Sequence, residues 1–212
     1  MLRRNGVRKL SKIGIFSGTF DPVHAGHIAF ALAAAEQAGL DTVYFMPEQQ
    51  PRRKEGVTHY AHRLAMLKLA LRPYKKLRIL ELPDRQFTVR SSWPRIKKQF
   101  KDSEVHLLIG SDMLRLLSST DAASQWPGYK KFLHEVRLVV GVRDEIDASE
   151  ASQLLATVQP GGVAVETDRP HVSSSAIRRA LMQGKQHAEL LGSLRSYIDE
   201  HWIYASIAPN NS

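Results

Sequence analysis

The chain contains no cysteine, so it can form neither a disulfide nor a thiolate metal site. It also has no long hydrophobic run. The first apolar stretch, Ile13–Phe16, ends at Ser17 and is too short for the core of a signal peptide. No stretch approaches the roughly 20 apolar residues that a membrane-spanning helix needs. These absences fit a reducing compartment, and we expect a soluble, cytoplasmic protein.

Three sequence patterns of common enzyme classes are absent as well. There is no G-x-x-x-x-G-K-[ST] loop and no G-x-G-x-x-G fingerprint, which argues against a P-loop kinase and a dehydrogenase. There is no G-x-S-x-G nucleophile elbow, so no covalent enzyme intermediate is implied. Acidic residues are in the minority, because 30 Lys and Arg against 21 Asp and Glu leave a net charge of +9. This balance favours an anionic partner, either nucleic acid or a ligand with several phosphates.

The length and the patterning predict the fold class. The 212 residues, 43% hydrophobic and 24% charged, suit one α/β domain with a sizeable core. Strand-like apolar runs alternate with helical patterns along the whole chain, which predicts a Rossmann-like doubly wound parallel sheet in three layers. We assign a single domain to residues 12–205, between a basic N-terminal tail at 1–11 and a C-terminal tail at 206–212. The expected strands are 13–16, 42–46, 77–82, 105–109, 136–142 and 162–166.

Two local features complete this prediction. Thr58 is expected to cap the helix that runs to Leu71, because a threonine hydroxyl can accept a free N–H of the first turn. The small and polar residues Ser118–Ser124 are expected to form a surface loop, which looks like an insertion.

The stretch Ser17–His27 is the centre of the functional prediction. It follows the first strand and precedes a strong helix former that ends at Gly39, so a strand, a tight turn and a helix are expected. Gly18 allows a ligand to approach the backbone, and the free N–H groups of a helix start favour phosphate. His24 and His27 are three residues apart and share one face of the first turn. Two imidazoles beside a phosphate-binding turn indicate chemistry on a phosphate.

A second cluster lies near the C-terminus. Ser173–Ser175 can merely cap a helix, but hydroxyls and free N–H groups at a helix start also bind phosphate. Arg178 lies one turn later and can brace a developing phosphate charge, which favours triphosphate binding. The cations at 52–54 follow the second strand, where a phosphate clamp is favoured over a solvated charge run, with Lys54 as the first candidate. In doubly wound sheets ligands bind beyond the carboxyl ends of the strands, where all these segments fall.

These motifs resemble a known family. Gly18–His27 resembles the signature of the H-x-G-H nucleotidyltransferase superfamily, and Val172–Arg178 resembles its second signature, I-S-S-T-x-I-R. Within that superfamily the chain is most similar to the bacterial nicotinate-nucleotide adenylyltransferases, with further matches spread over residues 13–204. The resemblance implies an enzyme of NAD biosynthesis that transfers the adenylyl group of ATP to a pyridine mononucleotide, most simply nicotinate mononucleotide. Pyrophosphate would leave with Mg²⁺, which would arrive with ATP, and no protein-held metal is expected.

The resemblance also implies roles for individual residues. The implied catalytic residues are His24, His27, Lys54 and Arg178. The implied ATP-binding residues are Gly18, Thr19, Phe20, Gly110, Asp112, Ser173, Ser174 and Ser175. The implied acceptor-binding residues are Thr88, Trp126 and Arg143.

Departures from the family pattern gather on the acceptor side. The segment Phe87–Ser91, which includes Arg90, stands where the family usually reads Tyr-Thr-x-x-Thr, while Arg53 replaces a histidine and Ser17 a glycine. Several alternatives therefore stay open: the same chemistry on nicotinamide mononucleotide or another phosphorylated acceptor such as phosphopantetheine, a basic nucleic-acid-binding module, or a degenerate homologue with a regulatory role. The sequence does not determine the oligomeric state.

Overall fold

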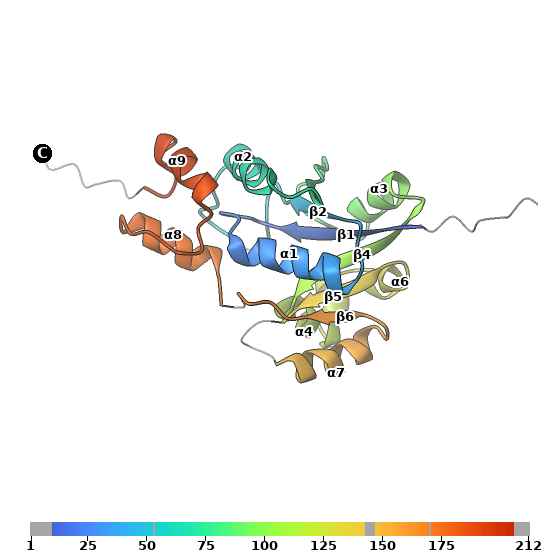
Figure 1. Cartoon of the computed structure of the whole chain (residues 1–212). Coiled ribbons are helices and arrows are strands. Elements are labelled where there is room, and N and C mark those ends of the chain that lie inside the picture. Colours follow the sequence, from blue (N-terminus) through green and yellow to red (C-terminus); the bar gives the residue numbers. More distant parts are fainter. Residues whose placement is uncertain (1–9, 53, 143–146, 170, 206–212) are drawn as a thin grey trace, which may run out of the picture.

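A six-stranded parallel sheet forms the centre of the fold (Figure 1). The computed structural model describes residues 10–52, 54–142, 147–169 and 171–205. The strand order is β3-β2-β1-β4-β5-β6, and every neighbouring pair is parallel. Since the order reverses after β1, the predicted Rossmann-like doubly wound sheet is confirmed. The strands are β1 (Ser11–Gly18), β2 (Thr42–Pro47), β3 (Leu77–Ile79), β4 (Ser103–Gly110), β5 (Arg137–Gly141) and β6 (Val163–Val165).

Helices cover both faces of this sheet. The helices α1, α2 and α9 share one apolar cluster with the sheet, and α3, α4, α6 and α7 share the other, so the predicted three layers are confirmed. Figure 1 shows α8 and α9 together at the end of the sheet toward which β1 points. The helices are α1 (Ala25–Gln37), α2 (Tyr60–Leu71), α3 (Ser92–Gln99), α4 (Ser111–Ser118), α5 (Ala122–Gln125), α6 (Tyr129–Leu133), α7 (Ala148–Val158), α8 (Ser174–Met182) and α9 (Gly192–Glu200).

The central strand β1 is apolar on both faces. Ile13 and Ile15 belong to the cluster with α3 and α4, whereas Phe16 belongs to the cluster with α1 and α2. Successive residues of a strand point to opposite faces, and a parallel strand buried on both sides therefore reads as a continuous apolar run. β1 is therefore a central strand, and the residues that follow it lie at the carboxyl ends of the central strands.

The predicted cap of α2 is wrong by one residue. His59 is the N-cap, and its Nδ1 accepts the backbone N–H of Ala61 at 3.4 Å. The backbone of Thr58 has other partners, since its N–H donates to the Asp21 carboxylate and its C=O accepts from Arg63. Tertiary contacts thus hold Thr58 just outside the helix.

Two other local predictions need correction. The loop expected at 118–124 is partly helical, because Ser118 ends α4 and α5 begins at Ala122, which is fully buried. The strand expected at 77–82 ends at Ile79, although the Leu80 N–H still donates to β2. At Ala122, burial in the core decides for a helix where local propensity favours a loop.

The predicted domain bounds, 12–205, stay a prediction. β1 begins at Ser11, the last residue of the predicted basic tail, and residues 1–9 and 206–212 lie outside the described ranges.

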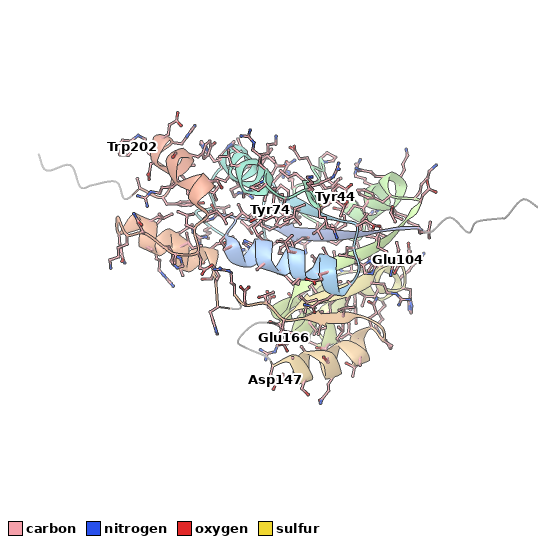
Figure 2. All side chains as sticks on the ribbon, viewed as in Figure 1. Tyr44, Tyr74, Glu104, Asp147, Glu166 and Trp202 are labelled. Carbon is pink, nitrogen blue, oxygen red and sulfur yellow. The ribbon has the colours of Figure 1, made fainter. Side chains whose placement is uncertain are left out.

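Two surface residues mark the ends of helices in Figure 2. Asp147 lies at the start of α7, where its carboxylate accepts the Glu150 N–H at 2.7 Å. Trp202 lies beyond α9 with 81% of its surface exposed. None of the helices described is both long and apolar enough to cross a lipid bilayer.

Candidate active site

A cleft of about 670 Å³ opens beyond the carboxyl ends of β1 and β4, where the strand order reverses. This is the position at which doubly wound sheets bind their ligands, and the volume is within the range of small-molecule sites. Most residues predicted for the site line this one cleft. They are Gly18, Thr19, Phe20, His24, His27, Lys54, Gly110, Asp112, Trp126, Ser173, Ser174, Ser175 and Arg178.

The turn after β1 holds an aromatic side chain, Phe20, that packs into the core. Phe20 has a φ of 50° and is 2% exposed, and its ring packs against Phe16 and Phe45 at centroid distances of 5.3 and 5.2 Å. A Cβ at Gly18 would lie 2.9 Å from the Phe20 ring. The close approach of this ring therefore requires a glycine at position 18. The sequence suggests a second reason, which is that a glycine also lets a ligand approach the backbone.

The two histidines form a compact pair at the start of α1. Their rings stack with centroids 3.7 Å apart, and His24 is 2% exposed. The His24 backbone N–H donates to Nδ1 of His27 at 3.3 Å. Because Nδ1 accepts, Nε2 is the ring nitrogen of His27 that can carry a proton and act as a donor.

Gly26 explains why the motif holds a glycine between its histidines. A Cβ at this position would lie 3.2 Å from Nδ1 and Cε1 of His24 and 3.1 Å from Cβ of Val172. The glycine thus lets the His24 ring and the segment before α8 approach the same helix turn. Gly26 was not predicted for the site, although its place in the H-x-G-H motif was a visible signal.

Direct hydrogen bonds join the two signature motifs. The Ser174 hydroxyl donates to the Pro22 carbonyl at 3.0 Å, and Nη1 of Arg178 donates to the Asp21 carbonyl at 2.7 Å. Nη2 of Arg178 also donates to the Ser175 hydroxyl at 3.2 Å. The start of α8 is therefore fixed against the β1–α1 turn, although 152 positions separate Pro22 from Ser174.

Other polar groups complete this side of the cleft. Nζ of Lys54 donates to the Thr19 hydroxyl at 2.9 Å, which brings the loop after β2 to the phosphate turn. Ser173 caps α8 by accepting the Ala176 N–H at 3.2 Å. Asp112 is exposed in the first turn of α4. The starts of α1, α4 and α8 therefore all face the same space, with free N–H groups suited to anions.

A buried arginine holds the loops around the cleft, and it was not predicted from the sequence. Arg63 is 1% exposed, and its guanidinium donates only to backbone carbonyls in the described contacts. The contact with Thr19 is 2.6 Å long, and that with Glu48 is 2.8 Å. The remaining acceptors are Thr58 at 2.8 Å and Gln49 at 3.1 Å. The one visible signal was an arginine within the apolar spacing of α2.

The carboxylate of Asp21 lies beside this arginine. It accepts the Thr58 N–H at 3.1 Å and the hydroxyl of Tyr204, which comes from the C-terminal segment. Burial lowers the pKa of Arg63, and the Asp21 charge opposes that shift. Burial, followed by the Asp21 charge, raises the pKa of Tyr204, so the phenol remains a protonated donor. The hydrogen bond between Asp21 and Tyr204 thus stabilises the turn that follows β1.

The opposite wall of the cleft is aromatic. The rings of Phe87 and Trp126 lie 5.6 Å apart, and they are 6% and 8% exposed. Glu48 anchors this wall, because its Oε1 accepts the Phe87 N–H at 3.1 Å and the Ser17 hydroxyl at 3.3 Å. Ser17 and Phe87, two departures from the family pattern, are therefore bound to the same carboxylate.

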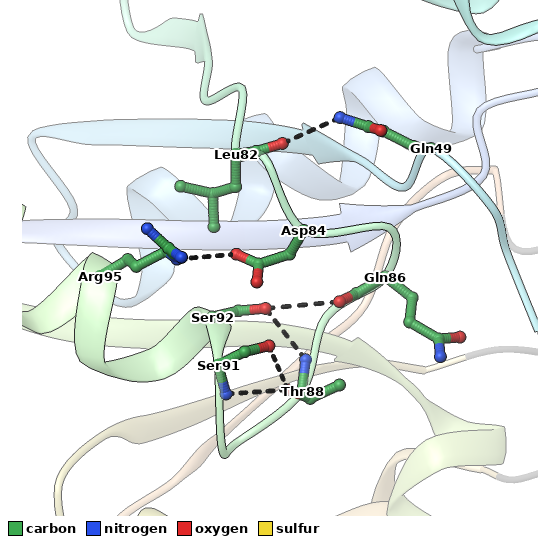
Figure 3. Close-up of polar contacts among 8 residues, drawn as sticks. All are labelled: Gln49, Leu82, Asp84, Gln86, Thr88, Ser91, Ser92 and Arg95. Carbon is green, nitrogen blue, oxygen red and sulfur yellow. Dashed lines mark hydrogen bonds and ion pairs between the residues drawn. The ribbon is translucent and has the colours of Figure 1, made fainter.

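Two of the predicted acceptor residues are not placed in the cleft. Thr88 does not line it, and its hydroxyl lies 2.6 Å from the Ser91 hydroxyl and accepts the Ser91 N–H at 3.0 Å (Figure 3). The Thr88 N–H donates to the Ser92 hydroxyl at 3.1 Å, so this residue organises the start of α3. Arg143 lies outside the described residues.

The carboxylates and histidines of the cleft do not form a metal cage. Within the described part of the chain, no group of three or more His, Cys, Asp or Glu side chains is placed to hold a metal ion. Asp21 is instead occupied by Thr58 and Tyr204. This donor set suits a metal that arrives on the phosphates of a nucleotide.

Comparison with known proteins agrees with this geometry. The cytidylyltransferase-like family model matches residues 15–180. Nicotinate-nucleotide adenylyltransferase of Bacillus subtilis is 31% identical over 206 residues, which cover 93% of this chain and 100% of the relative. A probable nicotinate-nucleotide adenylyltransferase of Thermomicrobium roseum is 30% identical, with 93% and 94% covered.

A solved structure shows the same fold at low identity. Nicotinic acid mononucleotide adenylyltransferase of Plasmodium falciparum, solved with NaAD, superposes with a TM-score of 0.73 at 16% identity. The alignment covers 92% of this chain and 97% of that one. Both signature motifs lie within the family match, and the relatives extend over nearly the whole chain. The chain therefore belongs to the cytidylyltransferase-like family and, within it, to the nicotinate-nucleotide adenylyltransferases.

Proposed function

We propose that the protein transfers the adenylyl group of ATP to the 5′-phosphate of nicotinate mononucleotide, forming the dinucleotide of NAD biosynthesis and pyrophosphate. One observation carries this proposal: the starts of α1 and α8 meet at one cleft, together with Lys54 and opposite an aromatic wall. The names of the Bacillus subtilis relative and of the Plasmodium falciparum structure with NaAD support the same substrates.

The reaction is a displacement at the α-phosphorus of ATP. A phosphate oxygen of the acceptor forms a bond to this phosphorus, and the bond to the pyrophosphate oxygen breaks. Such chemistry needs positioning and charge stabilisation more than a covalent partner. The His27 Nε2–H, the His24 ring and Lys54 supply donors beside the phosphate turn. Mg²⁺ that accompanies ATP would neutralise charge on the phosphates.

The two ends of the cleft suit different parts of the substrates. The helix starts, Thr19 and Ser173–Ser175 suit the triphosphate, and Arg178 can brace charge on it because its position is fixed by Asp21. Phe87 and Trp126 suit a flat ring, since their aromatic surfaces line the far wall. The acceptor roles of Thr88 and Arg143 remain predictions from the resemblance.

Pyrophosphate release tests the proposal. The purified protein should release pyrophosphate from Mg-ATP with nicotinate mononucleotide, and none without an acceptor. His24→Ala should lower the rate by about 10²–10³-fold, the usual loss when one positioned donor is removed. His134→Ala is the matched control, because His134 is exposed and does not line the cleft.

Other outcomes would contradict the proposal. No pyrophosphate from the wild-type protein with either nicotinate or nicotinamide mononucleotide would refute pyridine-nucleotide adenylyl transfer. Nucleic-acid binding that weakens steeply with salt and survives His24→Ala, in a protein without that activity, would instead favour the basic binding module.

A further inference from the structure

Arg52 is a cation of the cleft that the proposed chemistry leaves without a role. It lines the cleft, and its side chain is exposed. Its Nε donates to the Gln86 side chain at 2.8 Å. Nη1 and Nη2 point to the carbonyls of Gln125 and Phe87, at 3.4 and 3.5 Å. The guanidinium therefore lies against the two segments that carry the aromatic wall.

The charge of Arg52 is not neutralised by these partners. All three are neutral oxygen atoms, and no ion pair of Arg52 occurs within the residues that the structure describes. The two contacts of the terminal nitrogens are at the long limit of hydrogen-bond geometry. A guanidinium has five N–H donors in a planar fork, so its outer N–H groups can donate to a stronger acceptor. A carboxylate is the group whose geometry matches that fork.

Arg52 and Lys54 serve different parts of the cleft, although they are two residues apart. Nζ of Lys54 donates to Thr19 on the phosphate turn at 2.9 Å. Arg52 instead reaches Phe87, whose ring lies 5.6 Å from that of Trp126. One loop thus provides a cation for the phosphates and another for the ring end of the acceptor.

We propose that Arg52 determines the choice of acceptor: its guanidinium binds the carboxylate on the pyridine ring and thereby favours nicotinate over nicotinamide mononucleotide. This inference rests on the proposed function. The two acceptors share the ribose phosphate and differ only where a carboxylate replaces an amide. The carboxylate offers two charged acceptor oxygens to the fork, whereas the amide offers one neutral oxygen and an NH₂ group that cannot accept.

The test compares kcat/KM for the two mononucleotides at saturating Mg-ATP. The wild-type protein should prefer nicotinate mononucleotide by at least about tenfold. Arg52→Gln keeps a hydrogen-bond donor but removes the charge, so it should lower kcat/KM for this substrate by about 10–100-fold, the range for hydrogen bonds between charged groups. The value for nicotinamide mononucleotide should change less than about threefold. Arg52→Lys should retain part of the preference, because it restores the charge without the fork.

Arg90→Gln is the matched control for loss of a positive charge on the acceptor side. Arg90 is exposed and does not line the cleft, so this variant should keep both activities and the wild-type preference. If it reduced the preference as much as Arg52→Gln does, long-range charge would account for the effect and the proposal would be wrong.

Four further results would overturn the inference. An equal loss with both acceptors would assign Arg52 to their shared phosphate or to loop position, and no loss with either would show that it does not contact them. A wild-type preference for nicotinamide mononucleotide would also refute it, while adenylyl transfer itself would stand. Failure of the wild-type protein with both acceptors would refute the proposed function, and this inference with it.

Discussion

Removal of the Tyr204 hydroxyl should destabilise the protein although it leaves every cleft residue in place. This hydroxyl donates to Oδ1 of Asp21, 183 positions earlier in the chain, and Tyr204 and Asp21 are 9% and 2% exposed. Tyr204→Phe keeps the ring and its packing. It leaves one oxygen of a buried carboxylate without its partner, while the other keeps the Thr58 N–H.

The size of the effect follows from the charge of the acceptor. A hydrogen bond to a charged group contributes about 1.5–3 kcal/mol, and a buried charge without its donor cannot recover that from water. We therefore expect Tyr204→Phe to lower the free energy of unfolding by about 2 kcal/mol. For a chain of this length, that corresponds to a decrease in Tm of about 4–8 °C.

Urea denaturation at neutral pH measures this loss directly. Tyr197→Phe is the matched control, because its hydroxyl contacts an imidazole, that of His62 at 3.0 Å, in place of a buried carboxylate, and the side chain is only partly buried. That variant should lose less than about 1 kcal/mol. A loss below about 0.5 kcal/mol for Tyr204→Phe, or equal losses for the two variants, would refute the view that the C-terminal segment supports the phosphate turn through Asp21.

Three further predictions concern the turn, the buried arginine and a buried histidine. Gly26→Ala should reduce pyrophosphate release by more than about tenfold with the fold retained by circular dichroism, because the new Cβ displaces the His24 ring and a misplaced group costs orders of magnitude in rate. Arg63→Lys should destabilise by about 2 kcal/mol or more in urea, since an ammonium cannot reach four carbonyls of the β1–α1 turn and the segment between β2 and α2 at once. Burial lowers the pKa of His106, so the unfolded chain binds this proton more readily and the free energy of unfolding should fall as pH decreases through the ordinary imidazole range near 6.5. His106→Gln should flatten that pH dependence, and an unchanged slope would contradict the assignment.

Glu48 links the phosphate turn to the acceptor wall. Ser17 and Phe87, two predicted departures from the family pattern, both bond to its carboxylate. Arg52 adds contacts to the same loop through Gln86 and Phe87. The departures are therefore connected, which is the reason to test them as one specificity-determining unit.

Sequence-local features of the site could be predicted because their causes are local. An apolar run followed by Ser17–His27 and an alanine-rich segment can hardly form anything except a strand, a turn and a helix, and β1 and α1 have this arrangement. Serines before an apolar periodicity mark the start of α8 in the same way. The alternation of strands and helices then places both motifs at one sheet edge.

The contacts that hold these motifs together depend on residues far apart in the chain. Arg63 donates to backbone carbonyls, and every residue type has one, so no sequence pattern identifies its partners. Tyr204 and Asp21 are paired because the C-terminal segment packs against the turn that follows β1. Thr88, by contrast, is predicted to bind the acceptor, yet local hydrogen bonds join its hydroxyl to Ser91 at the start of α3. Residue order therefore specifies the elements and the chemistry at their ends, whereas tertiary packing decides which side chains reach the cleft and which ones support it.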